Sequence, residues 1–92
     1  MEKIALVTGA QRPEVVAYAR MLARQGQHIV LASTEWAKAV DAALTLQLEG
    51  LSAEALHLKD ADAAGVAAAR QQVIERRGHV DAVFIDESGL RA

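Results

Sequence analysis

The first sixteen residues constrain the fold more than any other part of the chain. Residues 3–8 form an apolar run that is too short for a helix, and Gly9 follows at once. From Pro13 onward, apolar residues recur at helical spacing. This pattern predicts a buried strand, a tight turn and a helix whose N-terminus lies at the carboxyl end of the strand. Such a helix N-terminus offers unpaired N–H groups and the positive end of the helix dipole, so it can bind a phosphate.

The alternation of strand and helix continues along the chain. The predicted strands are 3–8, 28–33, 53–58 and 80–86, and the predicted helices are 13–25, 35–49 and 63–77. Pro13 suits a first helical position, Thr34 is expected to cap the second helix, and Asp60 or Asp62 the third. Strands that alternate with helices predict a parallel sheet with right-handed crossovers, in one α/β domain over residues 1–92.

The second predicted helix has a wide apolar pattern. Trp36, Val40, Ala43, Leu44 and Gln47 share one helical face, which we expect to be the buried one. The additional leucines, Leu46 and Leu48, exceed what one sheet face requires, so we expect them to form a contact surface.

Composition excludes several functional classes. The 92 residues are 52% hydrophobic, contain no cysteine, carry a formal charge of −2 and are only 3% aromatic. The charge and the few aromatic residues argue against nucleic acid as a partner. No apolar run approaches the roughly 20 residues of a membrane span. We therefore expect a cytoplasmic protein without membrane contact, thiolate chemistry or disulfides.

Residues Thr8 and Gly9 open a turn that resembles the one in short-chain dehydrogenases and reductases, which reads Thr-Gly-x-x-x-Gly-x-Gly. The similarity continues through Gly50-Leu51-Ser52-Ala53-Glu54-Ala55 and through Gly78-His79-Val80-Asp81-Ala82-Val83. It implies the N-terminal half of a three-layer Rossmann-like fold, βαβαβαβ, with sheet order 3-2-1-4 and a ligand crevice between strands one and four. The flavodoxin-like order 2-1-3-4 is the alternative.

The glycine motif of this turn is degenerate. Pro13 and Val15 stand where the family has its second and third glycines, so one N–H is lost and bulk is added near the expected phosphate. Glu14 adds a carboxylate at the same helix terminus. These changes favour a turn kept for its architecture over one that binds a dinucleotide.

The resemblance implies a set of cofactor-binding positions. Arg12 would face the 2′-phosphate of NADP, and residues at the end of the second strand would select between NAD and NADP. The adenine contact falls by register on Lys59, one residue before Asp60, and the family's Asn-Asn-Ala-Gly corresponds to residues 86–89. The candidate residues are Thr8, Gly9, Arg12, Ser33, Thr34, Asp60 and Gly89. Asp86 and Glu87 replace two neutral amides there, which would repel a pyrophosphate.

Catalytic residues of the family are not matched. Its reductases use a serine and a tyrosine followed four residues later by a lysine, whereas the one tyrosine here, Tyr18, is followed by Leu22. We therefore predict no catalytic activity for the chain alone. The first prediction for its function is a Rossmann-like structural scaffold with weak or absent nucleotide binding. Its alanines, Pro13 and first-turn glutamates are stability choices that suit an engineered or designed protein. The alternative is an NAD(P)-binding module that needs a partner for catalysis.

Metal ligands and partners follow from the remaining residues. His28, His57 and His79 share no ligand spacing, and we expect them at the surface or at strand edges. Glu14, Asp86 and Glu87 could bind magnesium, but we favour their interpretation as surface carboxylates. The fourth strand carries Val83, Phe84 and Ile85, and an open apolar edge of this kind predicts a two-fold homodimer.

Overall fold

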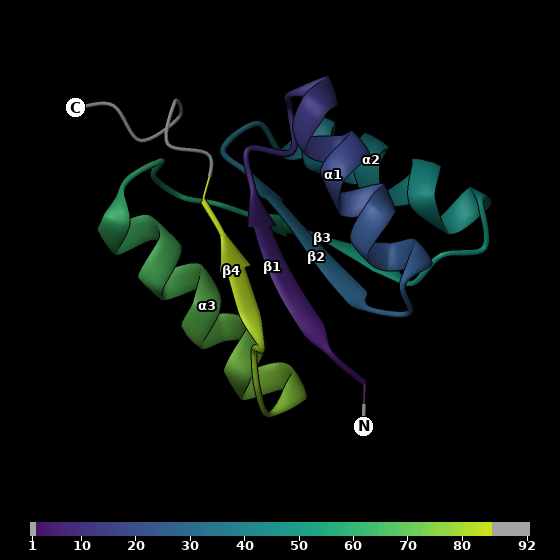
Figure 1. Cartoon of the computed structure of the whole chain (residues 1–92). Coiled ribbons are helices and arrows are strands. Elements are labelled where there is room, and N and C mark those ends of the chain that lie inside the picture. Colours follow the sequence, from purple (N-terminus) through teal and green to yellow (C-terminus); the bar gives the residue numbers. More distant parts are fainter. Residues whose placement is uncertain (1, 86–92) are drawn as a thin grey trace.

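The structure, a computed structural model, describes residues 2–85. It contains four strands and three helices in the predicted order (Figure 1). The strands are β1 (Ile4–Thr8), β2 (His28–Ser33), β3 (Ala53–His57) and β4 (Ala82–Phe84), and the helices are α1 (Pro13–Arg24), α2 (Trp36–Leu48) and α3 (Ala63–Arg77). All four strands are parallel and lie in the order β3-β2-β1-β4. This confirms the order 3-2-1-4 and excludes 2-1-3-4.

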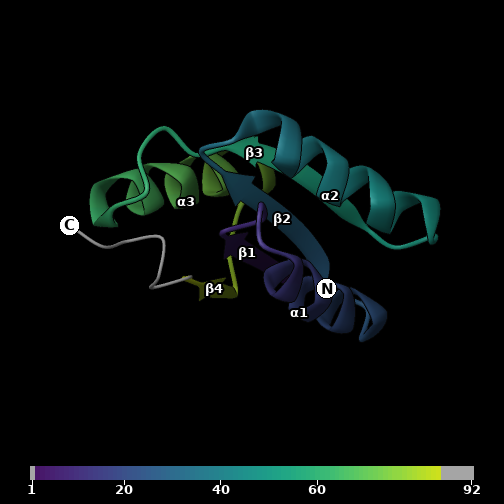
Figure 2. The ribbon, with the colours of Figure 1, turned by 90° about the horizontal axis from the view of Figure 1, so that it is seen from above.

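Helices cover both faces of the sheet. Helices α1 and α2 lie on one face and α3 lies on the other (Figure 2). Side chains alternate along each strand, so Val7 and Leu31 face α1 and α2 whereas Leu6 and Val30 face α3. The central strands β1 and β2 are buried along their whole length, which is why they read as continuous apolar runs. None of the helices within residues 2–85 is long and apolar enough to cross a membrane.

Glycines end the helices as their positions predict. Gly26, Gly50 and Gly78 each have φ between 81° and 95°, a left-handed conformation in which side chains are strained. Helix α3 is capped by Asp62, whose side chain accepts a hydrogen bond from the Gly65 N–H at 2.7 Å.

Helix α2 buries a different face from the predicted one. The side chains that contact the sheet are those of Ala39, Ala42, Ala43 and Leu46. Trp36, Val40, Leu44 and Leu48 form a second apolar stripe that is 50%, 37%, 48% and 79% exposed. The alanine-rich stripe is the buried one because small side chains let the helix approach the sheet closely. Leu46 therefore belongs to the core, and of the two additional leucines only Leu48 is available for contact.

Strand β4 is shorter than predicted at its start. The Asp81 N–H donates to the Ile4 carbonyl at 2.8 Å, and the Asp81 carboxylate accepts the Ile4 N–H at 2.7 Å. The Asp81 side chain thus takes the place of a backbone acceptor, and β4 begins only at Ala82. The strand also ends at Phe84, before its predicted end at Asp86, and Asp86 itself lies outside the described residues.

Candidate cofactor site

The turn between β1 and α1 lies at the carboxyl end of the sheet, between β4 and β2. Thr8 Oγ1 donates to the Phe84 carbonyl of β4 at 3.2 Å, and the Ala10 N–H donates to the Ala32 carbonyl of β2 at 3.1 Å. Gly9 has φ 84°, and its carbonyl accepts the Arg12 N–H at 3.0 Å, which closes the turn. Thr8 and Gly9 thus have the placement that the family turn requires, at the point where the strand order reverses.

The N-terminus of α1 is occupied largely by its own residues. Arg12 is the N-cap residue, and its Nε lies 2.6 Å from Glu14 Oε1. Pro13 has no N–H, and the Val15 N–H donates to the Arg12 carbonyl at 3.0 Å. Within residues 2–85, the Glu14 N–H is the first-turn donor that remains for an anion. Because Glu14 also carries a negative charge, it repels an anion that approaches this N–H. This helix N-terminus is therefore a weaker anion site than a glycine-rich one.

The end of β2 is tied to the same turn. Ser33 is 1% exposed; its hydroxyl donates to Gln11 Oε1 at 2.7 Å and accepts the Glu35 N–H at 3.0 Å. Thr34 does not cap α2, because the helix begins at Trp36 with Glu35 as its N-cap residue. The Thr34 carbonyl instead faces His57 Nε2 at 3.3 Å. Ser33 and Thr34 lie where the ribose selector was expected, but the Ser33 hydroxyl is already engaged within the protein.

Of the two residues predicted to cap α3, the structure confirms Asp62; Asp60 lies in the loop between β3 and α3 and does not cap the helix. The backbone of Asp60 lies against Gly65 in the first turn of α3. A Cβ on Gly65 would lie 1.9 Å from the Asp60 carbonyl oxygen, so only glycine fits where this loop crosses the first turn of α3. Gly65 could not be singled out from the sequence, because a glycine inside a helical pattern has several possible causes. Gly89, Asp86 and Glu87 lie outside the described residues.

A polar network at the opposite, amino end of the sheet was missed by sequence reasoning. His28, expected at a surface or edge, is 4% exposed. Its Nδ1 lies 2.6 Å from Ser52 Oγ and its Nε2 lies 2.6 Å from Glu54 Oε2. Glu54 also accepts hydrogen bonds from Arg76 and Arg77, both at 2.6 Å. These contacts join the starts of β2 and β3 to the C-terminus of α3.

Electrostatics differ between the carboxylates of the chain. Burial opposes ionisation of Glu54, but hydrogen bonds from His28 and Arg77 and the charges of both arginines outweigh it, so the pKa of Glu54 is lowered. The hydrogen bond from Arg20 is the main cause of a lowered pKa at Glu49, on the surface between α1 and α2. Over residues 2–85, no three His, Asp or Glu side chains are placed to hold a metal ion.

Comparisons with known proteins point to one family. No family model matches the chain. Over 87 residues it is 34% identical to a Streptomyces virginiae protein assigned as a ketoacyl reductase of the monensin polyketide synthase, which covers 95% of this chain and 33% of that protein.

Solved structures give the same answer. A metagenomic short-chain oxidoreductase in complex with NADP superposes with a TM-score of 0.77 at 27% identity, over 88% of this chain and 37% of that chain. An actinorhodin polyketide ketoreductase with NADPH gives a TM-score of 0.78 over 89% of this chain and 31% of that one; at 24% identity it shows the fold alone. The chain thus spans about a third of the length of these relatives. It has the fold of the N-terminal part of short-chain dehydrogenases and reductases, the family that its sequence resembles.

Proposed function

We propose that the chain is the cofactor-side unit of a short-chain oxidoreductase, with NADP as its dinucleotide and a low affinity for it. The observation that carries this proposal is the position of Arg12 at the start of α1, at the carboxyl end of β1. A guanidinium there suits the 2′-phosphate of NADP, because its fork of donors matches phosphate geometry. Relatives of this fold were solved with NADP and with NADPH, which supports the choice.

The affinity is low because Arg12 already has an anion beside it. Its Nε lies 2.6 Å from Glu14, so a dinucleotide phosphate must compete with a carboxylate of the same helix. At such distances even a water-screened charge pair is worth about 1 kcal/mol, or a factor of about five in affinity. Pro13 and Val15 remove the close backbone approach that glycines would allow.

Catalysis needs residues from outside this chain. The Tyr18 ring lies 4.7 Å from the Phe84 ring, centroid to centroid, so Tyr18 packs against β4. The residue four positions on is Leu22, which cannot relay a proton.

A structural scaffold without a ligand is the second candidate. The Arg12–Glu14 pair and Pro13 favour it, because a helix start that pairs its own charges needs no phosphate. The same choices would suit a chain engineered for stability.

Calorimetric titration separates the two candidates. We expect NADP to bind with Kd in the range of about 0.1–1 mM, which corresponds to about −5.5 to −4 kcal/mol. Glu14→Gln should tighten NADP about fivefold, and Arg12→Ala should remove the preference for NADP over NAD. Glu75→Gln, the same charge change on α3, is the matched control and should alter neither. If neither the natural chain nor Glu14→Gln binds NADP, the scaffold is the correct function.

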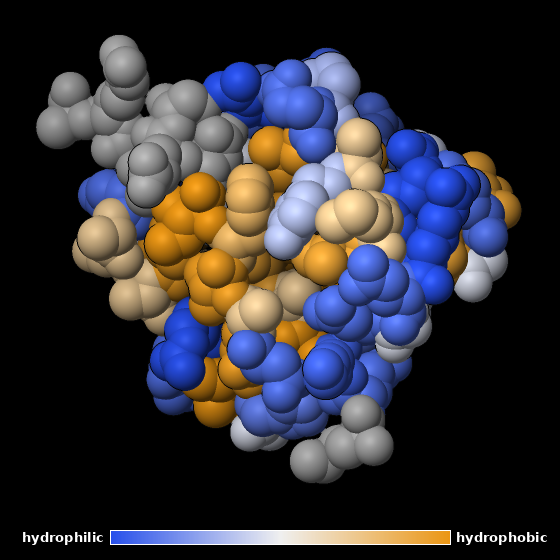
Figure 3. All heavy atoms as spheres, viewed as in Figure 1, coloured by the Kyte–Doolittle hydropathy of each residue, from blue (hydrophilic) through white to orange (hydrophobic). Residues whose placement is uncertain are grey.

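Self-association through β4 belongs to the same proposal. Strand β4 is an edge strand of the sheet, and the Phe84 ring packs against Tyr18 of α1. Apolar residues gather on this face of the molecule (Figure 3). A second copy that pairs with β4 across a two-fold axis would cover them. Light scattering after size exclusion should give twice the chain mass at high micromolar concentration, and a mass of one chain would contradict the dimer.

A further inference from the structure

Strand β3 leaves backbone groups unpaired at the other edge of the sheet. The Ile29 N–H donates to the Ser52 carbonyl at 3.1 Å and the Leu58 N–H to the Ser33 carbonyl at 2.9 Å. Within residues 52–58, the even-numbered residues therefore direct their backbone N–H and C=O groups to β2. Ala53, Ala55 and His57 direct theirs away from the sheet. Among those outward groups, only the Ala53 carbonyl has a hydrogen-bond partner within residues 2–85, Gln47 Nε2 at 2.7 Å.

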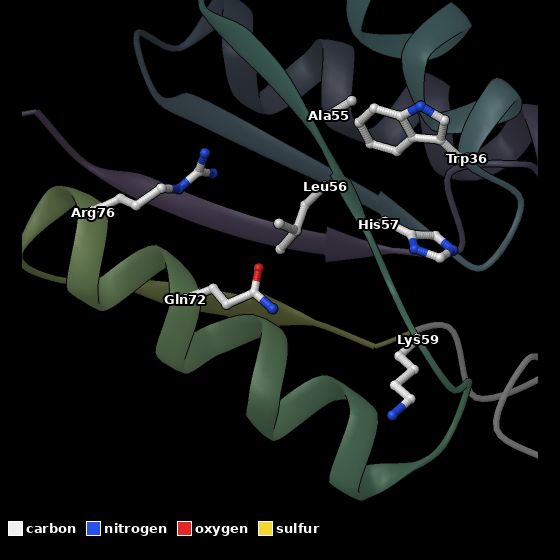
Figure 4. A pocket seen from close by; sticks show the side chains of 7 residues that line it. All are labelled: Trp36, Ala55, Leu56, His57, Lys59, Gln72 and Arg76. Carbon is white, nitrogen blue, oxygen red and sulfur yellow. The ribbon is translucent and has the colours of Figure 1, made fainter.

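A groove follows this edge. It has a volume of about 750 Å³ and is lined by side chains from α2, β3 and α3. Trp36 lies on the α2 side near Ala55, whereas Gln72 and Arg76 extend from α3 on the side toward which Leu56 points (Figure 4). We call this the β3 groove. The groove runs along the strand edge and is open to solvent.

The β3 groove combines an aromatic surface with positive charge. Trp36 is 50% exposed, and its ring meets the His57 ring edge-on at 6.2 Å. Lys59 and Gln72 make no hydrogen bond or ion pair within the described part of the chain. Arg76 donates through one nitrogen to Glu54 and keeps further donors. The lining includes two cations and no carboxylate.

We propose that the β3 groove binds an acidic peptide in an extended conformation, which adds as a fifth strand beside β3. Its backbone would pair with the outward groups of Ala55 and His57. Successive side chains of an extended peptide point to opposite faces. Apolar side chains would therefore contact Trp36, and alternate acidic ones would face Lys59 and Arg76.

Charge argues against a second copy as the occupant of the β3 groove. Two-fold pairing of β3 with itself would bring two grooves of the same positive charge together, which disfavours association. A small anion would leave the strand's outward N–H and C=O groups unpaired. An acidic strand satisfies the backbone groups and the cations together.

The single tryptophan makes the test direct, because Trp36 is the only indole in the chain and lies in the groove. The probe is a capped synthetic hexapeptide, Val-Glu-Phe-Glu-Val-Glu, titrated against the intact chain while Trp36 emission is recorded. We expect a saturable change in emission. Replacing the glutamates of the peptide by lysines should weaken binding at least fivefold.

Variants and modified peptides identify the binding mode. Lys59→Glu should weaken binding of the acidic peptide about fivefold and restore binding of the lysine peptide. The control is Lys38→Glu, which makes the same charge change on α2 outside the groove and should have neither effect. N-methylation of one alternating set of peptide amides should abolish binding, and methylation of the other set should leave it intact. Only a peptide paired along one edge gives this asymmetry.

Four outcomes of the ligand titrations would overturn the proposal. They are an unchanged emission, equal affinity for the acidic and lysine peptides, equal effects of the two methylation patterns, and equal affinity for phenylacetate, which would indicate a small-anion site. A Trp36 emission that depends on protein concentration without peptide would assign the groove to a second copy instead.

Discussion

The two ends of the parallel sheet are built differently. At the amino end, Glu54 joins His28, Arg76 and Arg77 in one network, and the Asp81 carboxylate holds the Ile4 N–H. At the carboxyl end, the turn after β1 contains an exposed ion pair, with Arg12 41% and Glu14 65% exposed. The charged network at the amino end is centred on the buried His28 and the half-buried Glu54, whereas the charged pair at the carboxyl end is exposed.

This difference separates stability from binding. Removing one member of a buried polar network leaves its partners unsatisfied, which costs stability, whereas exposed pairs contribute little. Substitutions of the exposed charged pair at the carboxyl end can therefore change ligand affinity while the fold is retained. Four predictions test this division, beginning with the largest effect.

Gly65→Ala should give the largest loss, because it crowds the backbone at the start of α3 and does not merely remove a side-chain pair. A Cβ there would lie 1.9 Å from the Asp60 carbonyl oxygen, so the loop must move. We expect the free energy of unfolding to fall by about 2–3 kcal/mol, measured by urea denaturation.

Gly26→Ala is the matched control for that substitution. A Cβ at Gly26 would meet no heavy atom within 4 Å, and only its φ of 94° is strained, so the loss should be about 1 kcal/mol. Equal losses in the two variants would mean that the contact with Asp60 does not limit the loop.

Glu54→Ala should come next and tests the amino end itself. It leaves the buried His28 without its Nε2 partner and separates two arginines from their carboxylate. We expect a loss of about 2 kcal/mol in the free energy of unfolding. Glu49→Ala, which also removes a carboxylate from two arginines but at the surface, should cost clearly less. A loss no larger than that of Glu49→Ala would mean that the Glu54 network stabilises the fold no more than the surface ion pairs of Glu49 do.

The pH dependence of stability sharpens the same point. The pKa of Glu54 is lower in the folded chain than its ordinary value of 4.5, so the unfolded chain binds the proton more readily. The stabilisation is complete above about pH 4.5 and is lost as the pH falls through the folded pKa. Glu54→Gln should therefore show a flatter decline of unfolding free energy in acid than the natural chain. If the two chains lose unfolding free energy in parallel as the pH falls, then other carboxylates cause the loss of stability in acid.

Glu14→Gln should have the smallest effect on stability. Its pair with Arg12 is exposed, so the free energy of unfolding should change by no more than about 0.5 kcal/mol. Circular dichroism during thermal unfolding provides the measurement. A loss well above 1 kcal/mol would show that this exposed pair also stabilises the fold, and the division between the two charged clusters would fail.

Local patterns predicted most of the elements. Strand β2 and helix α3 have the bounds that the apolar runs and the flanking glycines indicated, and Pro13 begins α1. These succeeded because a short apolar run, a first-position proline and a terminal glycine each act within a few residues. The tight turn at Gly9 was predicted correctly for the same reason.

Long-range partners could not be predicted in the same way. His28 and Glu54 are 26 residues apart, and Arg77 lies 23 residues beyond Glu54. Nothing near His28 in the sequence distinguishes it from a surface histidine. The choice between the two apolar stripes of α2 was also wrong, because both have helical spacing and only the fit to the sheet selects one.

The sequence by itself determined the kind and order of the elements, the position of the β1–α1 turn and the damage to its glycine motif. Apolar periodicity and the backbone limits of glycine and proline are local properties, so they can be read directly from the chain. Tertiary structure decided that Arg12 pairs with Glu14, that Glu54 gathers His28 and two arginines, and that β3 borders a cationic groove. Strand register and crossover packing bring those side chains together, and neither is written in any one segment.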